Sequence, residues 1–130
     1  MIEGQCLCGK VQYCLSSDLL FMYHCHCMEC RRYSGSSFAC NAAIVAADFS
    51  LRDPEESLQE YKTANGSRFF CRDCGTPIYS CAAGSTDYPS LHCGSINGHP
   101  ETRPSANLWL AEKCPWVDVD EALQNYQGAI

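Results

Sequence analysis

Seven of the 12 cysteines in this chain fall into three close-spaced clusters, a pattern that suits metal binding. The clusters are Cys6-x-Cys8, Cys25-x-Cys27-x-x-Cys30 and Cys71-x-x-Cys74. Two cysteines this close in sequence place both sulfurs on one tight turn, where they can bind one metal ion at about 2.3 Å. Two pairs together can close a four-thiolate site. A cluster of three leaves one coordination position open, and catalytic zinc sites keep such an open position.

The two pairs share a second feature, because each ends in Cys-Gly, at Cys8-Gly9 and at Cys74-Gly75. Glycine accepts the positive φ that lets backbone N–H groups fold over a sulfur, and these N–H groups offset thiolate charge. The pattern favours one zinc ion bound by both pairs, which would tie the first strand region to the middle of the chain. An iron–sulfur cluster and a set of simply buried cysteines are the alternative interpretations.

The three-cysteine cluster needs a fourth donor if it binds zinc, and the sequence leaves that donor open. The candidates are water, a substrate thiolate, His24, His26, or a distant cysteine from among Cys40, Cys81 and Cys93. A distant cysteine would make this a second closed, structural site. Arg31 and Arg32 follow the cluster and would offset thiolate charge or bind an anionic ligand.

The composition predicts one zinc-binding globular domain over residues 1–130. Hydrophobic residues make up 46% of the chain and charged residues 18%, which argues against disorder. The net charge of −6 and the nine scattered Lys and Arg residues disfavour a nucleic-acid partner. The longest apolar run, residues 42–47, is too short to span a membrane. The oligomeric state is left open.

Cysteine usage also predicts the compartment. Polar and charged residues occur throughout the first 20 positions, without the apolar segment of a secretory signal. A disulfide between cysteines as close as Cys6 and Cys8 would be strained. Both points favour metal binding and predict a reducing cytoplasm. The five spare cysteines lie mostly in strand-like runs, where a core position is favoured over a redox or metal-buffering role: Cys14, Cys40, Cys81, Cys93 and Cys114.

Short alternating runs, punctuated by Gly, Pro, Asn, Asp and Ser, dominate the chain and are typical of antiparallel strands. Strands are predicted at residues 11–15, 38–45, 58–61, 77–81 and 91–96. One short helix is expected after Cys27, ending near Gly35. A second helix is expected from Asp118, an N-cap with Glu121 as its capping-box partner, to about Gln127.

The cysteine clusters, in this order and with their flanking residues, resemble the glutathione-dependent formaldehyde-activating enzyme family, which also includes the centromere protein V type domain. The resemblance covers nearly the whole chain, through residues 4–11, 25–35, 68–78, 94–96, 103–104 and 108–116. It implies a mainly β fold of small antiparallel sheets pinned by zinc, the Mss4-like or β-tent architecture, with one or two short helices.

The resemblance also implies two zinc ions per chain and their ligands. Cys6, Cys8, Cys71 and Cys74 would hold a structural zinc, and Cys25, Cys27 and Cys30 would hold the zinc assigned to catalysis. The family's named reaction joins glutathione to formaldehyde through a carbon–sulfur bond, giving S-hydroxymethylglutathione. Family members often carry a His where this chain has Asn107, before Leu108 and Trp109. If that His lines the substrate cleft in relatives, the specificity of this chain differs from theirs.

We therefore expect a cytoplasmic zinc enzyme of the carbon–sulfur lyase type that acts on a glutathione-like thiol or on a thiol–aldehyde adduct. Arg68 or the Arg31-Arg32 pair would suit a substrate carboxylate. Tyr33, His26 and Glu29 are proton-transfer candidates through sequence proximity alone. The alternative is a non-catalytic binding or scaffold module with two structural zinc ions.

Overall fold

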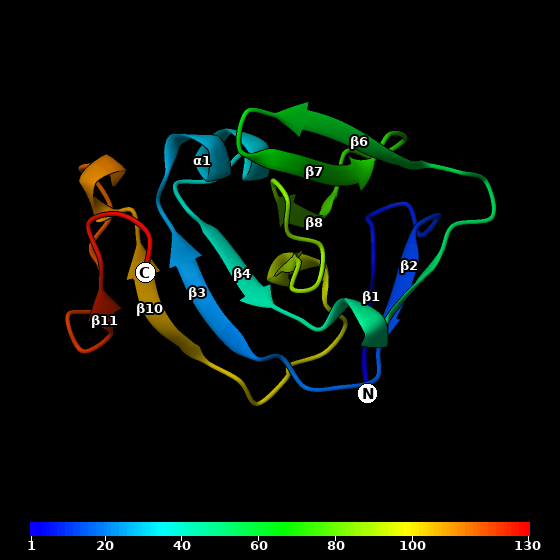
Figure 1. Cartoon of the computed structure of the whole chain (residues 1–130), viewed down its shortest axis with the longest axis horizontal. Helices are drawn as coiled ribbons and strands as arrows, with labels where there is room; N and C mark the ends of the chain where they lie inside the picture. The colour runs from blue at the N-terminus through cyan, green and yellow to red at the C-terminus, as the bar shows by residue number, and fades with distance from the viewer.

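Short strands form most of the regular structure in the computed structural model, which describes residues 1–130 (Figure 1). They are β1 (Ile2–Gln5), β2 (Gln12–Leu15), β3 (Phe21–Cys25), β4 (Ala39–Ala43), β5 (Phe49–Arg52), β6 (Leu58–Thr63), β7 (Gly66–Cys71), β8 (Pro77–Ala82), β9 (Ser90–His92), β10 (Pro104–Leu108) and β11 (Gln124–Asn125). The first four predicted strands correspond to β2, β4, β6 and β8. The fifth is shorter than predicted, because the chain leaves β9 for a 3₁₀ turn at Cys93–Ser95. The prediction of a mainly β fold is confirmed.

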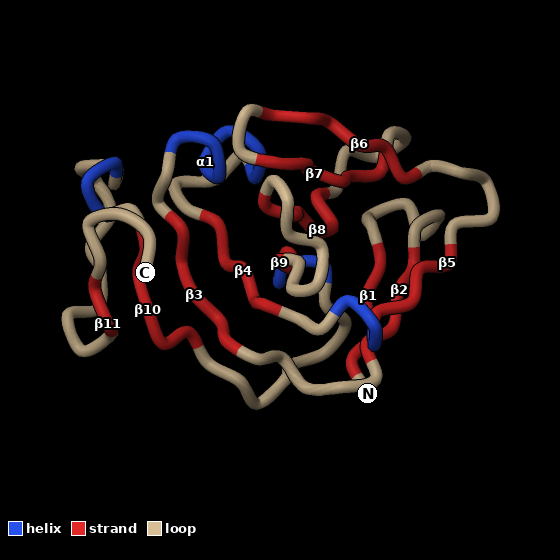
Figure 2. Tube along the Cα trace, in the orientation of Figure 1, coloured by secondary structure: helices blue, strands red, loops and turns tan.

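The strands form two sheets, drawn in red in Figure 2. The smaller sheet has the order β1-β2-β5 and is antiparallel. The larger sheet has the order β11-β10-β3-β4-β9-β8-β7-β6. It differs from the expected small antiparallel sheets, since β10 runs parallel to both β3 and β11. This pairing brings the C-terminal part of the chain beside β3, the strand that leads into the three-cysteine cluster.

The helix predicted after Cys27 is present as α1 (Met28–Ser34). Cys27 is its N-cap, and its sulfur accepts a hydrogen bond from the backbone N–H of Cys30. Gly35 ends the helix at a φ of 66°, a left-handed conformation that glycine adopts without a Cβ clash. Two of the three clustered cysteines, Cys27 and Cys30, therefore lie at the N-terminal turn of α1.

The helix predicted from Asp118 to Gln127 is wrong. These residues form turns and the short strand β11, and none of them is buried. A capping pattern cannot hold a helix that has no apolar face to pack, because isolated short helices are marginal in water. The segment instead bonds to β10, as the N–H of Tyr126 donates to the carbonyl of Asn107 at 2.9 Å.

The hydrophobic core lies between the smaller sheet and the centre of the larger one. Its fully buried side chains include Val11, Leu15, Ile44, Ile78 and Leu91, and the same cluster contains Cys6 and Cys71. Only 24 of the 130 residues are buried, so the apolar core is small. A metal ion bound at its edge would add directly to the folding free energy.

Successive side chains of β3 and β4 point to opposite faces of the sheet, so one face packs in this core and the other faces the candidate site. Met22 and Ala42 are cross-strand partners that belong to the core. Tyr23 and Asn41 are the next pair, so they face the opposite side of the sheet. The chain contains no helix with the length and hydropathy needed to cross a bilayer.

Candidate metal centres and the cavity beside them

The structure brings the two Cys-Gly pairs together into one cluster. The sulfurs of Cys6, Cys8, Cys71 and Cys74 all lie within 4.8 Å of one another. The Cys6–Cys8 sulfur distance is 3.6 Å and the Cys8–Cys71 distance is 3.8 Å. Four sulfurs placed tetrahedrally at the zinc–thiolate bond length are separated by about 3.8 Å. The donor set and its spacing therefore fit a tetrahedral zinc ion.

Two tight turns position these four sulfurs, one between β1 and β2 and one between β7 and β8. Gly9 and Gly75 follow the last cysteine of each turn at φ values of 82° and 80°, the positive φ expected of them. The N–H of Val11 points to the Cys6 sulfur at 3.3 Å, which offsets thiolate charge. Thr76 links the turns, since its hydroxyl accepts from the N–H of Leu7 at 2.9 Å.

The second cluster forms where β3 ends and α1 begins. The sulfurs of Cys25, Cys27 and Cys30 lie within 4.8 Å of one another, and those of Cys25 and Cys27 are 3.4 Å apart. The position of Cys27 as N-cap turns its sulfur back over the first turn of the helix, towards Cys30. Three soft thiolate donors suit zinc, so this cluster also fits a metal ion.

The three thiols of this cluster do not ionise alike. Hydrogen bonds from Cys25 and Cys30 hold the pKa of the Cys27 thiol well below its ordinary value, and the charge of Arg68 adds to the effect. The hydrogen bond to Cys27 raises the pKa of Cys25. A metal ion would displace the protons that the thiols of this cluster hold.

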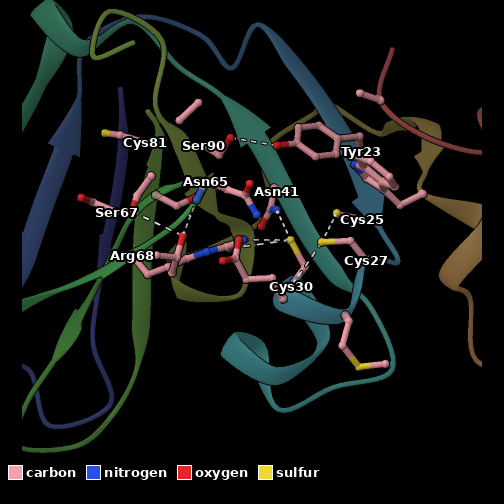
Figure 3. Close-up of a pocket in the computed structure, with 18 of the residues that line it drawn as sticks. Tyr23, Cys25, Cys27, Cys30, Asn41, Asn65, Ser67, Arg68, Cys81 and Ser90 are labelled. Carbon is pink, nitrogen blue, oxygen red and sulfur yellow. Dashed lines mark hydrogen bonds and ion pairs between the residues drawn. The ribbon is translucent and has the colours of Figure 1, made fainter. Parts of the chain in front are cut away.

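Arg68, on β7, supplies the positive charge beside these sulfurs (Figure 3). Its guanidinium lies 2.6 Å from a carboxylate oxygen of Glu29 and 3.6 Å from the Cys30 sulfur. The guanidinium carbon, Cζ, lies 4.9 Å from the centre of the Tyr33 ring. Although burial opposes ionisation of Glu29, the hydrogen bond from Arg68 lowers the pKa of that carboxyl. Both members of the pair are therefore charged at neutral pH.

A cavity of about 730 Å³ opens beside the three-cysteine cluster. Its walls come from β3, β4, α1, β7 and β8, and from the turn after β10. Neutral polar groups also line the cavity, among them Tyr23 and Ser90, which share a hydrogen bond of 2.8 Å (Figure 3). The amide of Asn41 points towards the Cys30 sulfur at 4.0 Å. The cluster thus faces a space large enough for a small organic molecule.

The structure separates the candidates for a fourth protein ligand from the three sulfurs, since none joins their cluster. His24 and His26 line a different hollow of about 410 Å³, together with Phe38. His26 is buried there, and its Nε2 lies 3.0 Å from the Asn107 side-chain oxygen. Cys40 and Cys93 pack against the main core. Cys81 alone among the distant cysteines lines the cavity.

Other residues singled out in the sequence also lie away from the cavity. Arg31 and Arg32 line a third hollow with Trp116, on another side of α1. The hydroxyl of Tyr33 donates to the backbone carbonyl of Phe69 at 2.6 Å and does not reach the cavity. Of the three proton-transfer candidates, Glu29 alone lines it.

Asn107, where relatives often carry a His, is buried and does not line the cavity either. Its side-chain nitrogen donates to the Asn125 side-chain oxygen at 3.0 Å. Because its oxygen contacts His26, the residue that follows β3, the amide links the end of that strand to β10 and β11. This position is therefore part of the sheet packing in this chain.

Sequence reasoning missed several residues of the cavity wall, notably Asn41, Trp109 and Glu112. Trp109 adopts a left-handed conformation (φ 58°, ψ 43°), which is uncommon for a bulky residue. The 3₁₀ turn Leu110–Glu112 follows, and a carboxylate oxygen of Glu112 accepts from the N–H of Met28 at 3.1 Å. No local pattern signals these contacts, since they depend on the pairing of β10 with β3.

Comparisons with known proteins find a matching family and a matching fold. A family model described as "Glutathione-dependent formaldehyde-activating enzyme" matches residues 1–112. A protein of Emericella nidulans named "Putative glutathione-dependent formaldehyde-activating enzyme" is 29% identical over 75 residues, which cover 57% of this chain and 38% of that protein. An "Uncharacterized lyase" of Schizosaccharomyces pombe is 28% identical over 78 residues, covering 59% of this chain and 55% of that protein.

The matched segment is thus about half the length of these curated relatives or less. A crystal structure of a Rhodobacter sphaeroides protein shares the fold, with a TM-score of 0.62. The two chains are 22% identical, and the match covers 76% of this chain and 91% of the other.

Proposed function

The chain belongs to the glutathione-dependent formaldehyde-activating enzyme family, and from this we propose that it is a zinc-dependent enzyme of the carbon–sulfur lyase type. Its substrate would be a thiol or a thiol–aldehyde adduct, of which glutathione is the example in the family's name. One observation carries the proposal: three clustered cysteine sulfurs border a cavity of about 730 Å³, and no fourth protein ligand joins them.

We assign the two clusters different roles. Cys6, Cys8, Cys71 and Cys74 would hold a structural zinc, because four thiolates complete a tetrahedral shell. Cys25, Cys27 and Cys30 would hold the catalytic zinc. A zinc ion there would lower the pKa of a substrate thiol and polarise a carbonyl. In this proposal residues 1–130 act as one zinc-binding domain, and a reducing compartment such as the cytoplasm keeps the thiols available.

The proposed reaction forms or breaks one carbon–sulfur bond. A substrate thiolate attacks the carbonyl carbon of an aldehyde, the carbonyl oxygen takes up a proton, and a hydroxyalkyl thioether results. The reverse reaction returns thiol and aldehyde, so atoms and electrons balance without an oxidant. Glu29 would accept the thiol proton at a carboxylate oxygen, a role supported by its position on the cavity wall. The hydroxyls of Tyr23 and Ser90 are available to hydrogen-bond the carbonyl oxygen.

The experiment is a titration of the cobalt-substituted protein, followed by its visible absorbance. We expect 2-mercaptoethanol to change the spectrum, since its sulfur adds to the open position, whereas 2-(methylthio)ethanol should not. Both probes are uncharged, so the comparison depends on the sulfur alone. If neither probe changes the spectrum, the open position is absent and the scaffold role with two structural zinc ions is favoured. If both do so equally, the thiol sulfur is not what binds the metal, and the proposed thiol chemistry is contradicted.

A further inference from the structure

We propose that the cavity beside the three-cysteine cluster selects thiols that carry a positively charged group, such as aminothiols, over thiols that carry carboxylates. This inference rests on the proposed function, because it takes a substrate sulfur to bind at Cys25, Cys27 and Cys30. It refines that proposal by assigning a charge to the rest of the substrate.

The first argument is the charge that surrounds the cavity. Glu29, Arg68 and Glu112 are the charged side chains that line it, apart from the cysteines. Arg68 already binds Glu29 at 2.6 Å and contacts the Cys30 sulfur, and its side chain is only 12% exposed. No free cation is therefore left for a substrate carboxylate. Three thiolates on a divalent ion carry a further net charge of −1, so the cavity is negative overall.

The second argument is the placement of Glu112. Its Oε1 accepts from the N–H of Met28, the first residue of α1, which holds the carboxylate close to the cysteine cluster. Glu112 is exposed, and no ion pair joins it to a cation. Arg31 contacts the backbone carbonyl of Glu112 at 3.2 Å but lines a different hollow. The carboxylate of Glu112 is thus available to a ligand in the cavity.

The third argument is a second lining residue, Trp109, which directly precedes the 3₁₀ turn that carries Glu112. Trp109 also lines the cavity, and its left-handed backbone is held by two hydrogen bonds. Its N–H donates to the carbonyl of Gly128 at 3.0 Å, and its carbonyl accepts from the N–H of Glu112 at 3.0 Å. An indole ring and a carboxylate that line one cavity suit an ammonium group, through cation–π attraction and charge.

Glutathione is a poor match for such a wall. It carries two carboxylates and one ammonium group, and ionisation of its thiol adds another negative charge. Its carboxylates would enter a cavity of negative charge in which the one arginine, Arg68, is already paired with Glu29. Arg31 and Arg32, the pair expected to bind an anionic ligand, lie outside the cavity.

Three probes with the same two-carbon spacing test the proposal: cysteamine, 2-mercaptoethanol and 3-mercaptopropionate. Each is titrated into the cobalt-substituted protein at neutral pH and low salt. We expect cysteamine to bind roughly tenfold more tightly than 3-mercaptopropionate, with 2-mercaptoethanol between them, which corresponds to about 1.4 kcal/mol. The preference should weaken as salt is added, because salt screens exposed charges.

The thiols of the three probes differ in acidity, so a variant is needed to isolate the cavity wall. Glu112→Gln keeps the oxygen that accepts from Met28 and removes the charge, whereas Glu101→Gln removes an exposed carboxylate outside the cavity. We expect the ratio of the cysteamine affinity to the 3-mercaptopropionate affinity to fall several-fold in Glu112→Gln and to stay unchanged in Glu101→Gln. An unchanged ratio in Glu112→Gln, or tighter binding of 3-mercaptopropionate by the unmodified protein, overturns the inference. If none of the three probes changes the spectrum, the proposed function itself fails.

Discussion

Both terminal nitrogens of Arg68 reach the Cys30 sulfur, at 3.7 and 3.6 Å. This contact places a fixed positive charge beside one of three clustered thiols, where it favours the ionised form that a metal ion requires. The charge comes from β7, whereas the sulfur belongs to α1. The metal affinity of the second centre therefore depends on how these two elements pack.

Replacement of Arg68 by methionine should weaken the second metal centre without abolishing the fold. We expect its zinc affinity to fall about 10- to 100-fold, the range typical when a group that supports metal ligands is lost. Competition with a chromophoric chelator would measure this, with the four-cysteine centre as an internal reference. Arg68→Lys is the matched control, since it keeps the charge but loses the forked contact with Glu29 and Cys30. Equal zinc affinity in all three proteins would show that Arg68 does not support the cluster.

The two cysteine clusters should respond differently to the loss of one ligand. Cys74→Ser removes a donor from the cluster at the edge of the core, so we expect unfolded or insoluble protein. Cys27→Ser should leave a folded domain with one zinc ion and no lyase activity, because the core and the first centre persist. Circular dichroism and elemental analysis of both variants would measure this contrast. Comparable loss of structure in the two variants would assign a structural role to the second centre as well.

Protein purified without added metal should contain two zinc ions per chain. The four-sulfur and three-sulfur clusters motivate this ratio, and elemental analysis with acid-labile sulfide determination would check it. A cluster of iron with sulfide, or a single zinc ion, is the outcome that contradicts the scheme.

His92 should make the protein less stable in mild acid. Burial, with a smaller contribution from Arg68, lowers the pKa of this imidazole, and its Nδ1 has no hydrogen-bond partner. The unfolded chain therefore takes up a proton at higher pH than the folded one, so stability is lost as the pH falls below about 6.5. His92→Phe should show a smaller loss of unfolding free energy between pH 7 and about pH 5.5 than the unmodified protein. Parallel losses in the two proteins would contradict this assignment.

Most parts of this site that sequence could predict are those built by local spacing; the exception is the meeting of the two Cys-Gly pairs, which their shared motif indicates. The turn cysteines, the two positive-φ glycines and helix α1 all depend on residues within a few positions of one another. The wall of the cavity does not, because Arg68, Trp109 and Glu112 reach it through the strand order of the larger sheet. A parallel contact such as that of β10 with β3 joins residues about 80 positions apart and leaves no periodic signal. The prediction of a helix after Asp118 was wrong because it used local spacing alone, and a capping pattern does not indicate whether a segment can be buried.

The four-cysteine cluster joins two turns that are 63 residues apart, from Cys8 to Cys71. An ion bound there would act on the unfolded chain as a cross-link does, by restricting a long loop. For a disulfide closing a loop of that length, the chain-entropy relation gives about 4 kcal/mol. Unlike a disulfide, this cross-link is opened by a chelator and left intact by a reductant. The attachment of the smaller sheet to the rest of the molecule would then depend on the supply of zinc as well as on the packing of the core.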